Sequence, residues 1–155
     1  MMPSCKSLKS RLRIFPVIPL VAFIFLAADA RPDFSVTLGY YSVPLKNREW
    51  SISVYRQGGD AFIEADNYLN LKAKKRLERD AYLRLVDYLN RQGIWRLTDR
   101  YPGSSRNCYY RIDITAEARS HSFRVEAGPL LSGENSRYRE IIRYLTNMAK
   151  RATEE

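Results

Sequence analysis

The sequence predicts an α+β fold: a mostly antiparallel sheet, built from two hairpins plus an N-terminal strand, with two helices packed on one face. Three observations support this prediction. Several segments alternate apolar and polar residues as strands do, two longer segments repeat apolar residues with the period of a helix, and the patterns follow one another as strands, helix, strands, helix. Hairpins between the helices, rather than single strands, favour antiparallel pairing.

The first half of the predicted sheet begins at Phe34. Phe34 to Tyr41 is rich in aromatic and β-branched residues, which strands favour. In Trp50 to Tyr55 apolar residues alternate with serines, as in a strand with one buried face. Gly58 to Asp60 provides turn chemistry, and Ala61 to Ala65 with Tyr68-Leu69 is the expected return strand. We therefore expect a hairpin here.

A helix is predicted next, from Leu77 to a glycine stop at Gly93. Its apolar residues fall on one helical face: Ala81, Tyr82, Leu85, Val86 and Leu89. Ile94 to Leu97 follows as a short apolar segment. Tyr101 to Asn107 is expected to be a loop because it contains proline, glycine and serine.

A second hairpin and a last helix complete the predicted fold. Tyr110 to Thr115 and Phe123 to Ala127 both alternate apolar and polar residues, and Ala116 to Ser120 joins them. The last helix is expected from about Arg137 to Arg151. Its apolar stripe comprises Tyr138, Ile141, Ile142, Leu145, Met148 and Ala149.

Residues 1–30 have the three parts of a cleavable secretory signal peptide. Lys6 to Arg13 carries four positive charges, Ile14 to Ala28 is an apolar run of 15 residues, and Ala28 to Ala30 offers small residues to signal peptidase. The run is shorter than the roughly 20 residues of a membrane-spanning helix, and it contains two prolines. We therefore expect a secreted or periplasmic protein with one domain, residues 31–155, and no membrane-spanning segment after cleavage.

The expected mature chain is basic and has one cysteine. From Arg31 onward, 22 Lys and Arg residues stand against 16 Asp and Glu residues, a net charge of +6. Such a charge favours anionic partners, including lipid head groups, acidic glycans and acidic proteins, whereas export argues against nucleic acid. Cys108 has no partner for an intramolecular disulfide, which leaves a small buried thiol or an intermolecular disulfide as alternatives.

The sequence gives little support to catalysis. Its single histidine, His121, and Cys108 lie in no recognisable nucleophile motif. Histidine and cysteine are too few for a clustered metal site, and no carboxylate set has the spacing of a calcium loop. Gly58-Gly59 lacks the framework of a phosphate-binding loop. We therefore predict a protein that is not an enzyme and that holds no metal ion or cofactor.

Two groups of residues are candidates for partner binding. The densest basic stretch holds four of them: Lys72, Lys74, Lys75 and Arg76. This stretch is either a docking surface for an acidic partner or the hydrated lead-in to the following helix. Tyrosines near loops are typical of protein-binding surfaces, and they add three candidates: Tyr40, Tyr41 and Tyr101.

The order of several segments resembles that of a known family. The segments are Ile52 to Gly59, Leu85 to Leu97, Tyr110 to Ile114 and His121 to Val125, followed by the terminal apolar helix. Over roughly residues 50–150 this order resembles emfourin, a family of small protein inhibitors of thermolysin-like metalloproteases. The resemblance implies a noncatalytic domain that binds a protein. It assigns no inhibitory residue, because Asp60 stands where an aromatic residue is expected.

Two functions follow from the sequence. The first is a protein-binding module, with protease inhibition as one form of it, that presents loops such as Tyr40 to Leu45 or Tyr101 to Asn107. The alternative is a cationic envelope-associated protein that binds anionic lipid or glycan through Lys72 to Arg79 and other arginine-rich surface. Salt distinguishes them, because exposed charges are screened beyond about 8 Å at physiological ionic strength.

Overall fold

The structure is a computed structural model that describes residues 33–42, 47–101, 108–128 and 136–154. The chain divides into two units, Met1–Arg31 and Pro32–Glu155, and every described residue belongs to the second. The expected signal peptide lies outside the described residues, as do residues 43–46 and 102–107 of the two expected loops. Export therefore stays a prediction.

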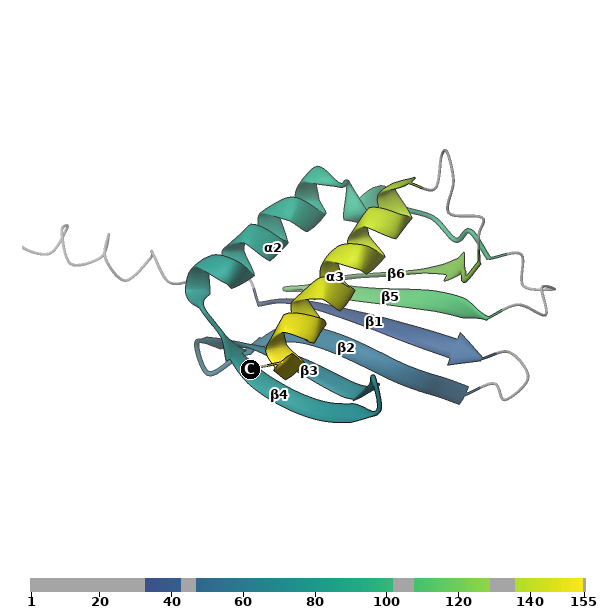
Figure 1. The fold of residues 1–155 in the computed structure, drawn as a ribbon. Coiled ribbons are helices and arrows are strands. Elements are labelled where there is room, and N and C mark those ends of the chain that lie inside the picture. Colours follow the sequence, from purple (N-terminus) through teal and green to yellow (C-terminus); the bar gives the residue numbers. More distant parts are fainter. Residues whose placement is uncertain (1–32, 43–46, 102–107, 129–135, 155) are drawn as a thin grey trace, which may run out of the picture. The chain divides into compact units, whose positions relative to one another are not determined.

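Among the described residues, six strands form a single sheet. Their bounds are Phe34–Ser42 for β1, Asn47–Gln57 for β2, Asp60–Tyr68 for β3, Leu71–Leu77 for β4, Tyr109–Ala116 for β5 and Arg119–Glu126 for β6. The order across the sheet is β4-β3-β2-β1-β5-β6, and every neighbouring pair is antiparallel (Figure 1).

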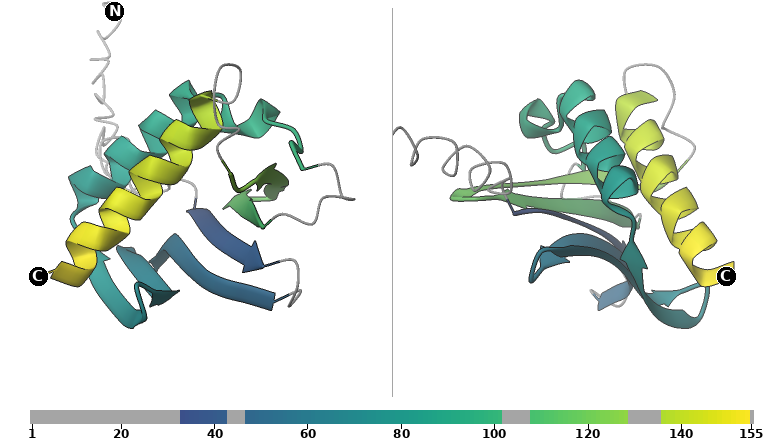
Figure 2. Two further views of the ribbon diagram at one scale, coloured as in Figure 1. Left: turned by 45° about the vertical axis from the view of Figure 1, so that its right-hand side comes forward. Right: turned by 90° about the vertical axis from the view of Figure 1, so that its left-hand side faces the viewer.

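Two α-helices of the described chain pack on this sheet. They are α2, Arg79–Arg91, and α3, Ser136–Glu154; a short 3-10 helix η1, Ile94–Arg96, follows α2. Both α-helices lie on one face of the sheet (Figure 2), which confirms the predicted α+β fold. No helix among the described residues combines the length and the apolar content that crossing a membrane requires.

The main departure from the predicted fold is an additional strand. The basic stretch is not a lead-in to a helix; it lies in β4, an edge strand in which Lys72 pairs with Asp66 and Lys74 with Glu64. Opposite charges on paired strands are stabilising, so this strand forms without an apolar alternation that the sequence would reveal. Because β4 extends to Leu77, α2 begins two residues later than expected.

The core lies on one side of the sheet, under the helices. The central strand β1 points Phe34, Val36 and Leu38 toward them, each no more than 3% exposed, and its alternate residues Ser35 and Thr37 point to the other face. The helices complete this core with Tyr82, Leu85, Leu89, Tyr138, Ile141 and Leu145. Because a single face of the sheet is buried, apolar and polar residues must alternate along each strand, as they do in the sequence.

Two buried tyrosines connect the helices to the rest of the fold. Tyr82 of α2 donates its hydroxyl to the Phe34 carbonyl at 2.7 Å, and burial raises the pKa of Tyr82. Tyr138 of α3 donates to the Thr98 carbonyl at 2.9 Å and accepts from the Thr98 amide at 3.3 Å. Since buried polar groups require partners, these bonds favour one position for each helix.

We expect Leu145→Ala to destabilise the fold by about 2–5 kcal/mol, because truncating a buried leucine removes apolar contacts and leaves a cavity. Leu145 is fully buried in the core. Urea titration followed by circular dichroism measures the free energy of unfolding. Leu71→Ala is the matched control, since Leu71 is 48% exposed on β4 and its truncation should cost about 0.5 kcal/mol or less. Equal losses in the two variants would contradict a one-sided core.

Candidate functional site

We name the sheet face opposite the helices the open face (Figure 2). Alternate residues of each strand reach it because side chains of a strand point to opposite faces in turn. They include Thr37 and Tyr41 from β1, Ser53 and Tyr55 from β2, Glu64 and Asp66 from β3, Lys72 and Lys74 from β4, Tyr109 and Arg111 from β5, and Ser122 and Arg124 from β6. Neither α-helix covers these side chains, so the open face is where distant parts of the chain can act together.

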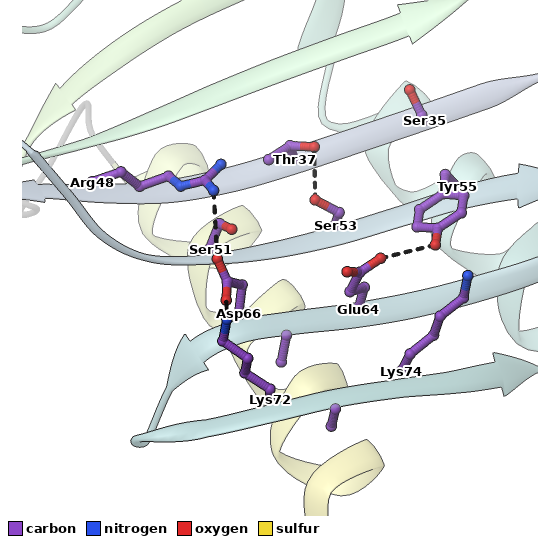
Figure 3. Close-up of a pocket in the computed structure, with 12 residues that line it drawn as sticks. Ser35, Thr37, Arg48, Ser51, Ser53, Tyr55, Glu64, Asp66, Lys72 and Lys74 are labelled. Atoms are coloured by element: carbon purple, nitrogen blue, oxygen red, sulfur yellow. Dashed lines mark hydrogen bonds and ion pairs between the residues drawn. The ribbon is translucent and has the colours of Figure 1, made fainter.

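A hollow of about 720 Å³ crosses β1 to β4 on the open face (Figure 3). Small hydroxyl side chains form its floor: Ser35, Thr37, Ser51 and Ser53. The Thr37 and Ser53 hydroxyl oxygens are hydrogen-bonded at 3.0 Å, and Ser51 is only 4% exposed. Because these side chains are short, an incoming group can approach the sheet closely.

Aspartates pair with the cations at the edge of this hollow. The Asp66 carboxylate lies 3.5 Å from the Arg48 guanidinium and 3.2 Å from the Lys72 ammonium (Figure 3). At the other end of β4, Arg76 and Asp60 are 2.6 Å apart. These residues are about 40% or more exposed, so the pairs orient the side chains more than they stabilise the fold.

Lys74 lies between aromatic rings. Its ammonium is 4.7 Å from the centre of the Phe62 ring and 5.4 Å from that of Tyr55. The hydrogen bond with Tyr55 raises the pKa of Lys74, so the amine stays charged. The Tyr55 hydroxyl in turn donates to Glu64 at 2.9 Å (Figure 3).

The structure separates the members of the basic stretch. Lys72, Lys74 and Arg76 reach the open face, whereas Lys75 lies opposite Ile63 and points to the helix side. There Lys75 borders a different hollow, together with Arg84 of α2 and Arg151 of α3. The four residues therefore do not make one docking surface, because a strand sends consecutive side chains to opposite faces.

Three tyrosines form a platform on the open face: Tyr41, Tyr101 and Tyr109. The Tyr41 and Tyr109 rings are parallel within 3°, with centres 5.0 Å apart, and Tyr101 lies 4.6 Å from Tyr109. A Cβ atom at Gly39 would lie 2.9 Å from the Tyr41 ring, so the glycine allows that ring to lie over the strand. We call this group the tyrosine platform.

Tyr40 lies on the helix side of the sheet, away from the tyrosine platform. Its ring stacks on Trp50 at 5.6 Å and lies 5.3 Å from Tyr110. A hydrogen bond with the Cys108 side chain, together with burial, raises the pKa of Tyr40 to about 12. Cys108 is half-buried, and both alternatives, a buried thiol and an intermolecular disulfide, stay predictions.

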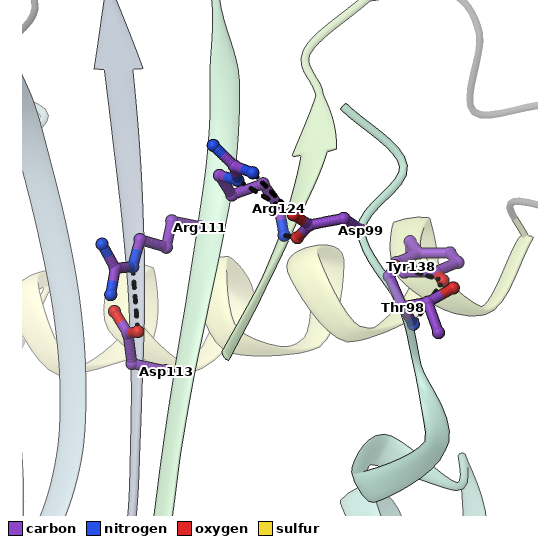
Figure 4. A network of polar contacts seen from close by, with 6 residues as sticks. All are labelled: Thr98, Asp99, Arg111, Asp113, Arg124 and Tyr138. Atoms are coloured by element: carbon purple, nitrogen blue, oxygen red, sulfur yellow. Dashed lines mark hydrogen bonds and ion pairs between the residues drawn. The ribbon is translucent and has the colours of Figure 1, made fainter. Parts of the chain in front are cut away.

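Arg124 of β6 connects the tyrosine platform to Asp99 and Arg100, the two residues that precede Tyr101 in the chain. Arg124 binds the Asp99 carboxylate through two side-chain contacts, at 2.7 and 3.2 Å, and its backbone amide donates to Asp99 at 2.7 Å (Figure 4). The Arg124 guanidinium also lies 5.8 Å from the Tyr101 ring. The same segment runs along the edge of β6, where the Arg100 amide donates to the Arg124 carbonyl at 2.7 Å and a bridge joins Arg100 to Val125.

His121 and Cys108 do not form a catalytic pair. His121 Nε2 is bonded to the Leu97 carbonyl at 2.7 Å, and His121 pairs with Ile114 on β5. Cys108 precedes β5, six residues from Ile114, which is about 20 Å along an extended strand. Within the described ranges, no three His, Cys, Asp or Glu side chains are grouped as metal ligands. The absence of enzymatic activity, metal and cofactor stays a prediction.

The arginines of the open face, Arg111 and Arg124, were not predicted from the sequence as site residues. Arg111 is bonded to Asp113 at 2.9 Å, beside the pair of Arg124 with Asp99 (Figure 4). The alternation of β5 places Tyr109, Arg111 and Asp113 on one face, so this signal was present in the sequence. The contact between Asp99 and Arg124, which lie 25 residues apart in the chain, has no such signal in the sequence.

The pair of Asp99 with Arg124 predicts a loss of stability in acid. Hydrogen bonds from Arg124 hold the pKa of Asp99 below its ordinary value of about 3.9, so the folded chain protonates this carboxylate at lower pH than the unfolded chain does. The contribution is therefore fully present above about pH 4 and lost as the pH falls through the lowered pKa. We expect Asp99→Asn to lower the free energy of unfolding at neutral pH and to flatten its decline in acid.

Urea titrations at about pH 7 and about pH 3 measure this difference. The effect should be about 1 kcal/mol or less, because the two side chains are 43% and 45% exposed. Asp87→Asn is the control, since Asp87 is exposed on α2 and no ion pair within the described residues includes it. An acid profile of Asp99→Asn identical to that of the wild type would show that the pair does not contribute.

Comparisons with known proteins do not identify the function of the chain. The chain matches no known family model, and it shows no significant sequence similarity to a curated protein. The resemblance to emfourin therefore stays a prediction, and the function is inferred from the arrangement of side chains.

Proposed function

We propose that the chain is a secreted or periplasmic, noncatalytic protein-binding module that receives its partner on the open face. The observation that supports this most is the tyrosine platform, fixed beside ion-paired arginines and a hollow with a hydroxyl floor. Tyrosine and arginine are enriched among the residues that contribute most to protein interfaces. Tyrosine also presents a large surface at a small cost in side-chain entropy.

The charge pattern of the open face favours a protein over an anionic lipid or glycan. Lys72, Arg76 and Arg124 each have a carboxylate at 3.2 Å or less. A polyanion would meet these carboxylates together with the cations, whereas a protein can place charges of both signs opposite them. The alternative function through Lys72 to Arg79 therefore has less support from the geometry.

The hollow suits a polar segment of a protein better than a small apolar ligand. Pockets for small molecules are lined mainly by apolar and aromatic side chains. Here most lining residues carry hydroxyl or charged groups, and the two alanines that border the hollow, Ala65 and Ala73, point their side chains to the helix side. A peptide segment has the hydrogen-bonding groups that such a lining requires.

The first test is site-specific cross-linking from the open face. A photoreactive phenylalanine analogue replaces Ser53, at the floor of the hollow, or Arg143, which is exposed on α3 and serves as the control position. We expect a covalent adduct with a protein from position 53 and not from position 143, because the partner lies on the open face. Adducts from position 143 alone would contradict the proposal.

The second test compares two stacked tyrosine pairs. We expect Tyr41→Ala with Tyr109→Ala to weaken binding of the cross-linked partner by about tenfold or more, as truncation of interface tyrosines does. The control double variant is Tyr88→Ala with Tyr144→Ala, because these rings stack at 4.3 Å on α2 and α3, away from the open face. Equal weakening in both double variants would argue for a general effect on folding.

The same variants test protease inhibition as the form of this function. We expect the wild-type chain and the Tyr88/Tyr144 variant to inhibit a secreted thermolysin-like metalloprotease equally, and the Tyr41/Tyr109 variant to inhibit less. The measurement is the rate of peptide cleavage at increasing concentrations of the chain. Binding without inhibition would keep the binding module and exclude an inhibitor of that protease class.

A further inference from the structure

A second hollow, of about 580 Å³, lies outside the open face. It is lined by residues from the end of α2, from η1, from the start of β6 and from the start of α3. Four arginines line it, one from each of these elements: Arg91, Arg96, Arg119 and Arg137. We call it the arginine pocket, and its charge is produced by the fold rather than by a basic run in the sequence.

Among the described residues, no carboxylate lines the arginine pocket, whereas carboxylates accompany the cations of the open face. No aspartate or glutamate is among its described lining residues. Within the part of the chain that the structure describes, no salt bridge joins its four arginines to an acidic side chain. Positive charges gathered in this way repel one another and attract an anion.

The position of Arg137 adds to this excess of positive charge. It lies in the first turn of α3, and no acidic residue is present in that turn. The amino end of a helix carries a partial positive charge, so a cation there is unfavourable unless an anion lies nearby. A bound anion would interact favourably with both the arginine and the helix end.

The wall of the pocket is held in place by an indole ring. Trp95 donates its ring N–H to the Asn90 side chain at 3.2 Å and meets Phe34 edge-on, with ring centres 6.3 Å apart. The Arg119 guanidinium lies 4.3 Å from the centre of the Trp95 ring. This contact orients the planar guanidinium before a ligand arrives, which lowers the entropy cost of binding.

A tight turn opens one side of the pocket. Gly93 adopts a left-handed conformation, with φ of 67°, and the chain passes there from α2 into η1. A Cβ atom at Gly93 would meet nothing within 4 Å, so the lining is open at this point. The Gly93 carbonyl accepts from the Arg96 amide at 2.8 Å, which fixes the start of η1 beside the pocket.

We propose that the arginine pocket binds a ligand carrying two or more phosphate groups. Guanidinium groups bind phosphate oxygens through paired hydrogen bonds, and four of them match the charge of a diphosphate or triphosphate. The volume lies within the range of about 300–1,000 Å³ that is usual for ligand pockets. This site is independent of the open face and of the protein partner proposed there.

Calorimetric titration of the purified chain with inorganic phosphate, pyrophosphate and tripolyphosphate tests the proposal. We expect affinity to rise in that order, because each added phosphate reaches more guanidinium groups. Arg96→Gln with Arg137→Gln should raise the Kd for pyrophosphate by about tenfold or more, since each substitution removes a charge-assisted contact. The control is Arg139→Gln with Arg143→Gln, which removes the same charge from exposed positions of α3 outside the pocket.

The control double variant should change the Kd by less than about twofold, because its charges are farther from the ligand and more strongly screened. No heat with tripolyphosphate, or equal weakening in both double variants, would overturn the proposal. Vesicles containing phosphatidic acid distinguish the sources of the phosphate. Vesicle binding lost only in Arg96→Gln with Arg137→Gln assigns a lipid head group, and pyrophosphate binding without vesicle binding assigns a soluble phosphorylated molecule.

Discussion

The structure depends on burial of one face of the sheet by two helices. A six-stranded antiparallel sheet with one covered face must place apolar residues at every second position, and β1 shows this with buried Phe34, Val36 and Leu38. The opposite face is then free to carry polar groups at no cost to the core. The buried core and the polar open face are thus built from alternate residues of the same strands.

The alternation explains why much of the fold could be predicted from sequence. Periods of two and of 3.6 residues identified five of the six described strands and both α-helices. The strand β4 was not predicted because its sequence lacks an alternation of apolar and polar residues. The residues that point to the helix side are of mixed type and include both Ala73 and Lys75. The stability of this strand comes from pairing with β3, and pairing between strands is not visible in a local pattern.

The candidate site was less predictable than the fold. Tyr40 and Tyr41 are neighbours in sequence, yet strand geometry sends them to opposite faces, and only Tyr41 joins Tyr101 through Tyr109. The alternation of side chains along a strand could have assigned Tyr40 and Tyr41 to opposite faces from the sequence alone. The meeting of Tyr101 with Tyr109 requires the segment before β5 to pass beside β6, which depends on contacts between residues far apart in the chain.

Charges of the two surfaces are organised differently. On the open face, aspartates accompany the arginines and lysines, so side chains are oriented with little excess charge. In the arginine pocket, four arginines line one hollow, and no described carboxylate lines it with them. Net charge alone, which is +9 for the whole sequence, does not reveal this division. A surface with nearly balanced charges and a hollow with a local excess of positive charge therefore coexist on one small chain.

The protection of the sheet's two edges has a consequence for solubility. At one edge, β4 carries lysines at alternate positions; at the other, the Arg100 segment occupies backbone groups of Arg124 and Glu126. Exposed strand edges are templates on which further chains can add, and such growth leads to fibrils. Like-charged lysines on two β4 strands would repel each other, and β6 has fewer free amides and carbonyls to offer. The chain can therefore leave one face of its sheet uncovered by helices while discouraging its own copies from stacking edge to edge.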